Sequence, residues 1–360
     1  MNMVKFKQLI FYLIFFITTY FIYVYPYVII KFFFSQENIF KISSIIFNFI
    51  PYILIIFYFK TNNTFFLLKL YVYEGMGIGF ISFWIVNLGL LIDIFSSIRS
   101  FDIGIVSVLS IIIITIYSLI NGRLISIKNI EIYSSKVKNK VRIIFLSDMH
   151  LGTNKKRHLE KIYTKINNLE FDLFLIGGDL LDSSSFKLED LNIFNNIKKP
   201  ILYINGNHEC YLKDYEKKMK ELNNYNLLFL DDTNFKFKNI NIIGISDQQK
   251  LESQKIKVEK YYKDELFNLI VVHKPTLWNS VLEKTDLMLS GHTHNGQIFP
   301  FNFIVNLQFK NIYGLYEKLN SKLYVSSGSG CWGPKMRLGS KNEIVSIQIS
   351  GNRDNDGILN

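Results

Sequence analysis

The strongest constraint on this chain is a series of short motifs rich in histidine, aspartate and asparagine. Five of the six histidines in the 360-residue chain belong to them. In chain order the motifs are Asp148-Met149-His150, Gly177-Gly178-Asp179, Gly206-Asn207-His208-Glu209, His273 and Gly291-His292-Thr293-His294. Oxygen and imidazole ligands without cysteine suit divalent ions such as Mn, Fe, Zn or Mg. The motifs therefore predict a site for two such ions.

Each motif follows a short apolar run that is typical of a buried β-strand. These runs cover residues 141–147, 172–176, 201–204, 269–272 and 286–290. In layered α/β folds, ligands gather beyond the carboxyl ends of the strands. We therefore expect the motifs to meet at one edge of a sheet structure, with helices near residues 158–168, 186–197 and 212–224 between the strands.

The motifs resemble those of the calcineurin-like metallophosphoesterases, whose pattern is D-x-H, G-D, G-N-H-[DE], H and G-H-x-H. Every element is present in that order, and the resemblance covers roughly residues 124–350. Further features are similar to the membrane-anchored bacterial branch, which includes enzymes that cleave UDP-diacylglucosamine; they are Gly291 to Ile298, Phe299-Pro300, Gly328-Ser329-Gly330, Arg337 and Glu343. Asn295 is a departure, since many members have glycine there, but we expect metal binding to survive it.

The resemblance implies an α/β fold, a two-sheet metallophosphoesterase sandwich with flanking helices, and a role for each motif residue. One ion would be held by Asp148, His150 and His294, the other by Asn207, His273 and His292, with Asp179 as the bridge. His208 would be the catalytic residue, acting on the leaving group without binding metal. The implied reaction is hydrolysis of a phosphoester or pyrophosphate by attack of a metal-bound hydroxide, since two metals can clamp such a displacement.

The first third of the chain has a different composition. Residues 1–122 carry seven basic and four acidic side chains, and long apolar segments cover about 8–30, 43–59, 75–95 and 103–121. A membrane-spanning helix needs about 20 apolar residues, and a signal peptide would explain only the first segment. We expect an all-α transmembrane domain of about four spans in 1–123, the phosphoesterase domain in 124–350 and a polar tail in 351–360. The segment 43–59 is short and contains Asn48 and Pro51, so three or five spans remain alternatives.

Orientation depends on few charges. With the N-terminus inside, six basic residues lie on the inner side and three on the outer side; they are Lys5, Lys7, Lys60, Lys69, Arg123 and Lys128 against Lys31, Lys41 and Arg99. This bias favours a cytoplasmic N-terminus. Four spans then place the catalytic domain in the cytoplasm, at the inner membrane of a bacterium, whereas an odd number would place it outside.

A site beside a bilayer favours a phosphorylated, lipid-linked substrate, with membrane lipids as further partners. A nucleotide or nucleic-acid phosphodiesterase and a non-catalytic membrane-tethered scaffold are the alternatives. We expect no nucleic-acid partner, because no recognition motif accompanies the basic clusters at 155–157 and 217–220. His158 is expected at an exposed helix start outside the site, and Cys210 is expected to be buried near it. The sequence leaves the oligomeric state open.

Overall fold

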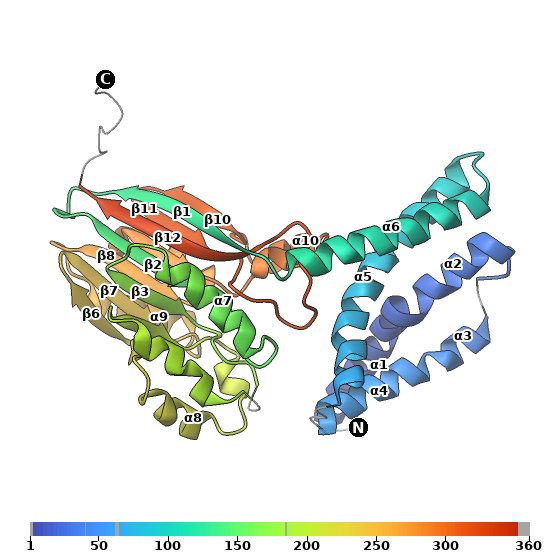
Figure 1. The fold of residues 1–360 in the computed structure, drawn as a ribbon, viewed down its shortest axis with the longest axis horizontal. Coiled ribbons are helices and arrows are strands. Elements are labelled where there is room, and N and C mark those ends of the chain that lie inside the picture. The colour runs from blue at the N-terminus through green and yellow to red at the C-terminus, as the bar shows by residue number, and fades with distance from the viewer. Residues whose placement is uncertain (1–2, 40, 62–64, 184–185, 352–360) are drawn as a thin grey trace. The chain divides into compact units, whose positions relative to one another are not determined.

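The computed structural model describes residues 3–39, 41–61, 65–183 and 186–351 (Figure 1). The chain divides into two compact units. The first, here the helical unit, comprises Met1–Asn121 and Gly333–Met336; the second, here the catalytic unit, comprises Gly122–Trp332 and Arg337–Asn360. The polar tail predicted for 351–360 lies outside the described residues from 352 onward.

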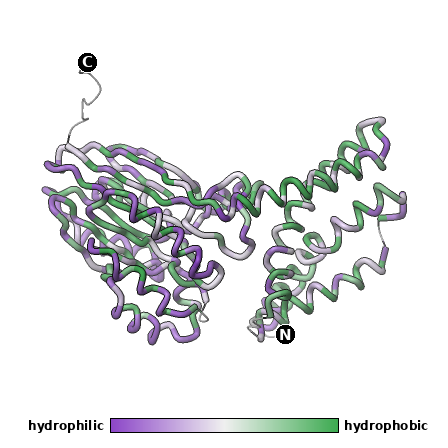
Figure 2. The backbone as a smooth tube through the Cα atoms, in the orientation of Figure 1, coloured by the Kyte–Doolittle hydropathy of each residue, from purple (hydrophilic) through white to green (hydrophobic). Residues whose placement is uncertain are grey.

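Among its described residues, the helical unit has four helical segments that are long and apolar enough to cross a membrane: Lys5–Ser35, Ile42–Thr61, Phe66–Phe95 and Ser100–Asn121. The first joins α1 (Met3–Thr19) to α2 (Tyr25–Ser35) through one π-helical turn, η1 (Tyr20–Val24), and the second joins α3 (Ile42–Phe47) to α4 (Phe49–Thr61). The others are α5 (Phe66–Phe95) and α6 (Ser100–Asn121). Hydrophobic residues dominate these helices along their length (Figure 2). The predicted number of apolar helices is thus confirmed, and α5 begins earlier than the predicted segment 75–95.

The polar residue in the second segment has a partner within the helical unit. Asn48 is buried, and its side-chain amide donates a hydrogen bond to the carbonyl of Phe16 at 2.9 Å. Pro51 lies in the first turn of α4, where the missing backbone N–H would have no intrahelical partner. Neither residue therefore interrupts the segment.

The catalytic unit contains two six-stranded sheets. The first has the order β1-β12-β2-β3-β4-β5 and the second β10-β11-β9-β8-β7-β6. The first sheet comprises β1 (Ile125–Tyr133), β2 (Val141–Leu146), β3 (Leu173–Gly177), β4 (Ile201–Ile204), β5 (Leu228–Phe229) and β12 (Asn342–Ser350). The second comprises β6 (Thr233–Phe237), β7 (Ile240–Ile245), β8 (Phe267–Val272), β9 (Leu287–Ser290), β10 (Gly314–Lys318) and β11 (Ser321–Val325).

Pairing is parallel along β2-β3-β4-β5 and along β7-β8-β9-β11, whereas β12 runs antiparallel to β2. The carboxyl ends of the ligand-bearing strands of each sheet therefore lie at one edge of that sheet. The predicted two-sheet α/β sandwich is confirmed.

Alternation along the strands builds the core. In β2, Ile143 and Phe145 pack in a cluster with residues of the second sheet such as Leu269, while Ile144 packs in the cluster that lies under the helices. Successive side chains of a strand point to opposite faces. Because both faces are buried, the strands are almost continuously apolar.

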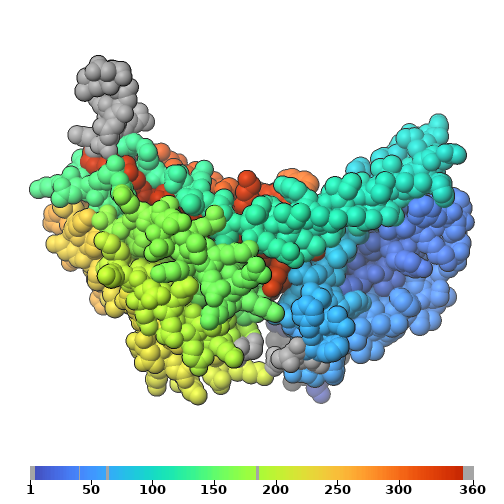
Figure 3. Space-filling model, in the orientation of Figure 1, coloured from blue at the N-terminus to red at the C-terminus, as the bar shows by residue number. Residues whose placement is uncertain are grey.

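Helices cover the outer faces. The first sheet is covered by α7 (Lys156–Asn167), the 3₁₀ helix η2 (Leu188–Asn196) and α8 (Tyr215–Leu222), whose green to yellow atoms form the front of this unit (Figure 3). The second sheet packs against α9 (Leu251–Tyr261) and η4 (Pro275–Ser280). The helix predicted at 186–197 is thus 3₁₀, not α. Its buried residues Leu188, Leu191 and Phe194 recur every third position, which matches three residues per turn.

Candidate metal centre

The predicted ligands follow five strands of the two sheets. Asp148 and His150 follow β2, Asp179 follows β3 and Asn207 follows β4. In the second sheet, His273 follows β8, and His292 and His294 follow β9. The two sheets thus contribute to one site from the ends of their central strands, as the motif order predicted.

The first group of ligands consists of Asp148, His150 and His294. The Nε2 atoms of the two histidines are 3.0 Å apart, and His294 Nε2 lies 3.4 Å from Asp148 Oδ1. His150 Nε2 is 3.8 Å from the same carboxylate oxygen. Three donor atoms that converge this closely can hold one cation.

The second group consists of Asp179, His273 and His292. His273 Nε2 is 3.1 Å from Asp179 Oδ2 and 3.3 Å from His292 Nδ1. The same Asp179 oxygen is 3.9 Å from His150 Nε2 in the first group. Asp179 therefore lies where one carboxylate can reach two cations.

Asn207 lies beside Asp179. The backbone N–H of the next residue, His208, donates to Asp179 Oδ1 at 2.8 Å. The side-chain oxygen of Asn207 is buried and accepts no hydrogen bond among the described residues. A buried carbonyl oxygen without a donor is costly, and a cation would satisfy it. The donor set therefore fits two divalent ions.

Two of the imidazole rings are oriented by contacts of the ring nitrogen that faces away from the site. His273 Nδ1 lies 2.9 Å from the carbonyl of Gly177 and donates its proton there, which turns Nε2 toward the site. His150 Nδ1 faces Asp182 Oδ2 at 3.5 Å, while the other Asp182 oxygen accepts from the Thr153 backbone at 2.8 Å. Sequence reasoning missed Asp182, because its spacing from Asp148 belongs to no motif.

Burial and charge shift the pKa values of these groups strongly. Burial raises the pKa of Asp179, but His273 and His150 outweigh it, and the net shift is well downward. Burial lowers the pKa of His273, but Asp179 and Asp148 raise it to about 10. Burial and the charge of His273 lower the pKa of His292 to about 3. The site therefore keeps anionic carboxylates and favours positive charge between them, as a cation site requires.

The backbone at the ligands is unusual. Five ligands that are not glycine have φ between 46° and 71°, as does Asn295 at 50°; they are Asp148, His150, Asp179, His292 and His294. Such left-handed residues are uncommon, with Asn, Asp and His enriched among them, and they cluster at functional sites. The same φ explains the departure at Asn295, because asparagine tolerates a conformation that otherwise favours glycine.

Close approach of two loops requires glycine at one motif position. A Cβ on Gly291 would lie 1.9 Å from Ser147 Oγ and 2.3 Å from Asp148 Oδ2. Only glycine lets the loop after β9 touch the loop after β2.

His208 lies at the open side of the two groups. Its Nε2 is 4.0 Å from Asp179 Oδ2, its ring contacts those of His150, Tyr211 and Trp332, and 18% of its side chain is exposed. Burial lowers its pKa. A partly exposed imidazole at this position can reach a bound substrate.

Glu209 and Arg337 support the ligand loops from within. The buried Glu209 carboxylate accepts hydrogen bonds from the backbone N–H groups of Asp179, Leu181 and Gly206 at 3.1, 2.9 and 2.8 Å. The buried Arg337 guanidinium donates to the carbonyls of His294 and Gly330 at 2.9 and 2.6 Å. Both residues belong to the quoted motifs, but the sequence did not indicate these partners.

Two expectations about neighbouring residues are corrected. His158 lies in the first turn of α7, as expected, but it is half-buried rather than exposed, and its Nε2 lies 2.7 Å from the carbonyl of Ser329. The reason is that the loop after β11 folds back over α7. Cys210 is half-buried rather than buried, because its sulfur lies at the edge of the site beside Gln248.

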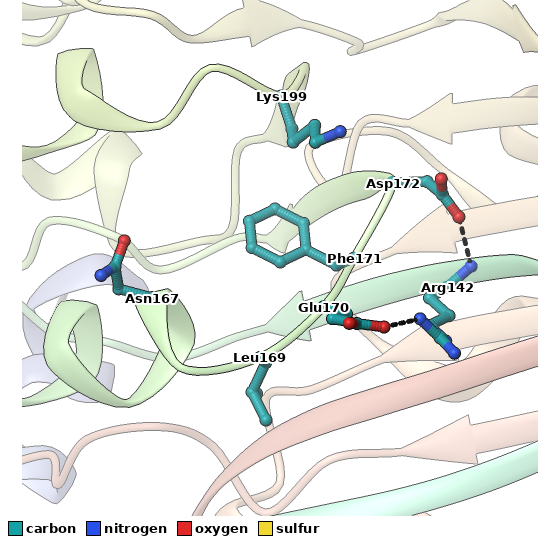
Figure 4. Close-up of a pocket in the computed structure, with 7 residues that line it drawn as sticks. All are labelled: Arg142, Asn167, Leu169, Glu170, Phe171, Asp172 and Lys199. Atoms are coloured by element: carbon teal, nitrogen blue, oxygen red, sulfur yellow. Dashed lines mark hydrogen bonds and ion pairs between the residues drawn. The ribbon is translucent and has the colours of Figure 1, made fainter.

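A separate surface hollow lies away from these ligands. It is lined by Arg142, Asn167, Leu169, Glu170, Phe171, Asp172 and Lys199 (Figure 4). Arg142 is the second residue of β2 and Asp172 directly precedes β3, so the hollow is at the amino ends of these strands. It contains none of the predicted ligands, and its Arg142–Glu170 ion pair neutralises charge there.

Comparison with known proteins identifies the class of this fold and site. The family model of the calcineurin-like phosphoesterases matches residues 141–296. An uncharacterized metallophosphoesterase of Campylobacter jejuni is 34% identical over 256 residues, which are 66% of this chain and 67% of that protein. The chain belongs to the calcineurin-like metallophosphoesterase family, and is thus a metal-dependent phosphoesterase.

Other relatives match over a similar region. A metallophosphoesterase of Helicobacter pylori is 34% identical over 62% of this chain and 63% of its own length. A transmembrane protein with a metallophosphoesterase domain from Danio rerio is 29% identical over 66% and 60%. The match thus spans about two thirds of these relatives or less. The crystal structure of Thermus thermophilus TT1561 is 10% identical over 53% of this chain and 90% of that one, with a TM-score of 0.34.

Proposed function

We propose that this protein is a membrane-anchored phosphohydrolase that cleaves a phosphoester or pyrophosphate in a lipid-linked substrate. The observation that supports the reaction most is the pair of ligand groups that share Asp179, with His208 on their open side. When bound, two divalent cations would neutralise phosphoryl oxygens and lower the pKa of an attacking water.

The chain's own residues have separate tasks in this proposal. Asp148, His150 and His294 would hold one ion, and Asn207, His273 and His292 the other, with Asp179 between them. His208 would donate a proton or hydrogen bond to the leaving oxygen. Its ring contacts that of the buried His150 and is itself partly exposed, so a leaving group can depart there.

The lipid-linked substrate is supported by the helical unit. Four apolar helices and a transmembrane relative indicate association with a membrane. Only residues 122–124 separate α6 from β1, and three extended residues span at most about 10 Å. UDP-diacylglucosamine, cleaved at its pyrophosphate, is the first candidate substrate, by the sequence resemblance. A phospholipid headgroup or an isoprenoid phosphate would suit the same location.

The role of His208 provides the test. His208→Ala should retain both metals and lose about 10²–10⁴ in rate, the usual size of a general acid–base contribution. The loss should be smaller for nitrophenyl phosphodiesters than for alkyl ones, because nitrophenolate leaves without protonation. Metal content and kcat on both substrates measure this.

Equal losses on good and poor leaving groups would contradict the role of His208. A wild-type protein that holds two metals but turns over no phosphodiester, monoester or pyrophosphate would instead favour a scaffold. Mass spectrometry of lipid extracts from cells with and without the protein then identifies which phosphorylated lipid accumulates.

A further inference from the structure

The catalytic unit has an exposed apolar surface at helix α10 (Phe301–Gln308). All eight residues of α10 are described, and none of them is buried. Five large apolar residues are exposed there, and together they are called the α10 surface. They are Phe299, Phe301, Phe303, Ile304 and Leu307, which are 50%, 43%, 62%, 50% and 88% exposed. A helix on a soluble surface ordinarily buries its apolar stripe against the core. Here the large apolar side chains face outward.

These side chains lie on a defined face of a firmly held helix. Phe303 and Leu307 are four residues apart and Ile304 lies between them, so all three are on one side of α10. The opposite side is attached to the metal centre. Phe309, directly after the helix, is buried with its ring 5.2 Å from that of His292, and Asn302 packs so closely on Gly296 that a Cβ there would lie 2.3 Å away.

A pair of hydrogen bonds links the segment before α10 to the open side of the site. Gln297 accepts a hydrogen bond from the Trp332 backbone N–H and donates to its carbonyl, both at 2.9 Å. The Trp332 side chain is 52% exposed, and its ring lies 5.7 Å from that of His208. Trp332 is thus held to Gln297, four residues before α10, with its exposed ring beside the residue proposed to act on the leaving group.

We propose that the α10 surface inserts into the boundary between headgroups and acyl chains of a lipid bilayer. Interfacial helices place aromatic and aliphatic side chains in this layer, with lysine at the headgroups, and Lys310 is exposed just after α10. The three-residue connection to α6 keeps the catalytic unit within reach of a membrane. Insertion would bring lipid phosphates beside the metal ligands. The inference goes beyond the proposed reaction, and its test requires no turnover.

The test locates one residue in the full chain. Leu307→Cys, in a Cys210→Ser background, is labelled with the environment-sensitive fluorophore NBD and reconstituted into phosphatidylcholine–phosphatidylglycerol liposomes. Ile256→Cys is the matched control, because Ile256 is a 62% exposed aliphatic residue on α9 of the same unit. The background without an added cysteine measures labelling of the buried Cys331.

Insertion predicts a blue-shifted emission at Leu307 and strong quenching by lipids that carry a nitroxide on the acyl chain, with neither effect at Ile256. Emission like that of Ile256, quenched by aqueous iodide, would overturn the proposal. A blue shift without quenching by the nitroxide lipids would also overturn the proposal. It would mean that α10 is covered by protein, either the apolar helices of the same chain or a second copy. Activity of the same samples on a soluble aryl phosphodiester separates failure of insertion from failure of the proposed reaction.

Discussion

Asp179 is the residue at which both ligand groups meet. One of its oxygens faces His273 and His150 at 3.1 and 3.9 Å, and the other accepts from the His208 backbone. Its side chain is almost completely buried, so water cannot replace these contacts. A change of this carboxylate should therefore affect both metals and the position of His208 together.

Asp179→Asn should sharply reduce activity and weaken at least one metal site. The amide keeps the size of the side chain but removes the negative charge and one acceptor oxygen, and hard divalent ions prefer charged oxygen ligands. Elemental analysis and turnover of an aryl phosphodiester measure the two effects. Two tightly held metals with full turnover in this variant would rule out the bridging role.

Asp231 is a buried carboxylate with a different sensitivity. It accepts from the backbone N–H and the side-chain amide of Asn205 at 3.0 and 2.6 Å. Burial raises its pKa to about 6, despite these hydrogen bonds. An unfolded chain has an aspartate pKa of about 3.9, so the folded unit favours the protonated form.

Because the folded-state pKa of Asp231 is raised, its effect on the free energy of unfolding becomes less favourable as pH rises. The cost of ionising Asp231 is absent below about pH 4, grows between about pH 4 and 6, and is complete above about pH 6. Two pKa units correspond to about 3 kcal/mol at most. Asp231→Asn should therefore lose less stability than wild type as pH rises from 4.5 to 7, as measured by the unfolding midpoint of the catalytic unit. Parallel pH profiles for the two proteins would contradict this assignment.

At the scale of elements, one side chain joins the loops after β3 and β4. Glu209 accepts hydrogen bonds from three backbone N–H groups, and these groups come from both loops. The same two loops carry Asp179 and Asn207. Glu209→Ala would leave these donors buried without an acceptor, at about 1–3 kcal/mol each. We expect a lower unfolding midpoint and reduced metal content.

Glu209→Gln is the matched control for this prediction. The glutamine keeps one acceptor oxygen and nearly the same volume, so it should lose less stability than the alanine variant. Thermal unfolding and elemental analysis of both variants test the order. Equal stability of wild type and Glu209→Ala would mean that the loops do not depend on this carboxylate.

The strand ends could be predicted from sequence because apolar runs and ligand types are local signals. Val141 to Leu146 and Leu287 to Ser290 are recognisable strands, and each leads directly to a motif. Contacts between segments that are far apart in the sequence could not be predicted. The contact of His158 with Ser329 spans 171 residues, and its local sequence is that of an exposed helix start.

The same limit applies to the C-terminal strand and to η2. Parallel pairing of β12 with β1 joins the two ends of the catalytic unit, and no local pattern encodes that partner. The apolar spacing in η2 was visible, but a period near three and one near 3.6 differ little over nine residues. The sequence therefore predicts a helix there but does not distinguish 3₁₀ from α.

At the scale of the whole chain, the number of apolar helices controls where the catalytic unit lies. The uncertain segment is a helix over Ile42–Thr61, 20 residues long, and its polar Asn48 is hydrogen-bonded to Phe16. The donor group of Asn48 is thus paired within the helical unit, as backbone and side-chain donors in a bilayer interior must be. These features support four spans over three.

The basic residues agree with an even number. Helix α5 has 30 residues, or about 45 Å, against a hydrocarbon core of about 30 Å. Lys69 in its first turns can therefore lie outside the core with Lys60, on the side of Lys5 and Lys7. Six basic residues then lie on the side of the N-terminus and three on the other side. By the positive-inside rule we expect the N-terminus and residues 124–360 in the cytoplasm.

Reporter fusions in a bacterial host test this sidedness. Green fluorescent protein joined after Asn360 should fluoresce, because it folds in the cytoplasm, while alkaline phosphatase at the same position should be inactive, because its disulfides need an oxidising compartment. Fusions after Ser96, between α5 and α6, should show the reverse pattern and serve as the internal control. An active phosphatase with dark fluorescent protein after Asn360 would place the metal centre outside. It would also exclude UDP-linked lipids, which are made in the cytoplasm, and leave phospholipid or isoprenoid phosphates as substrates.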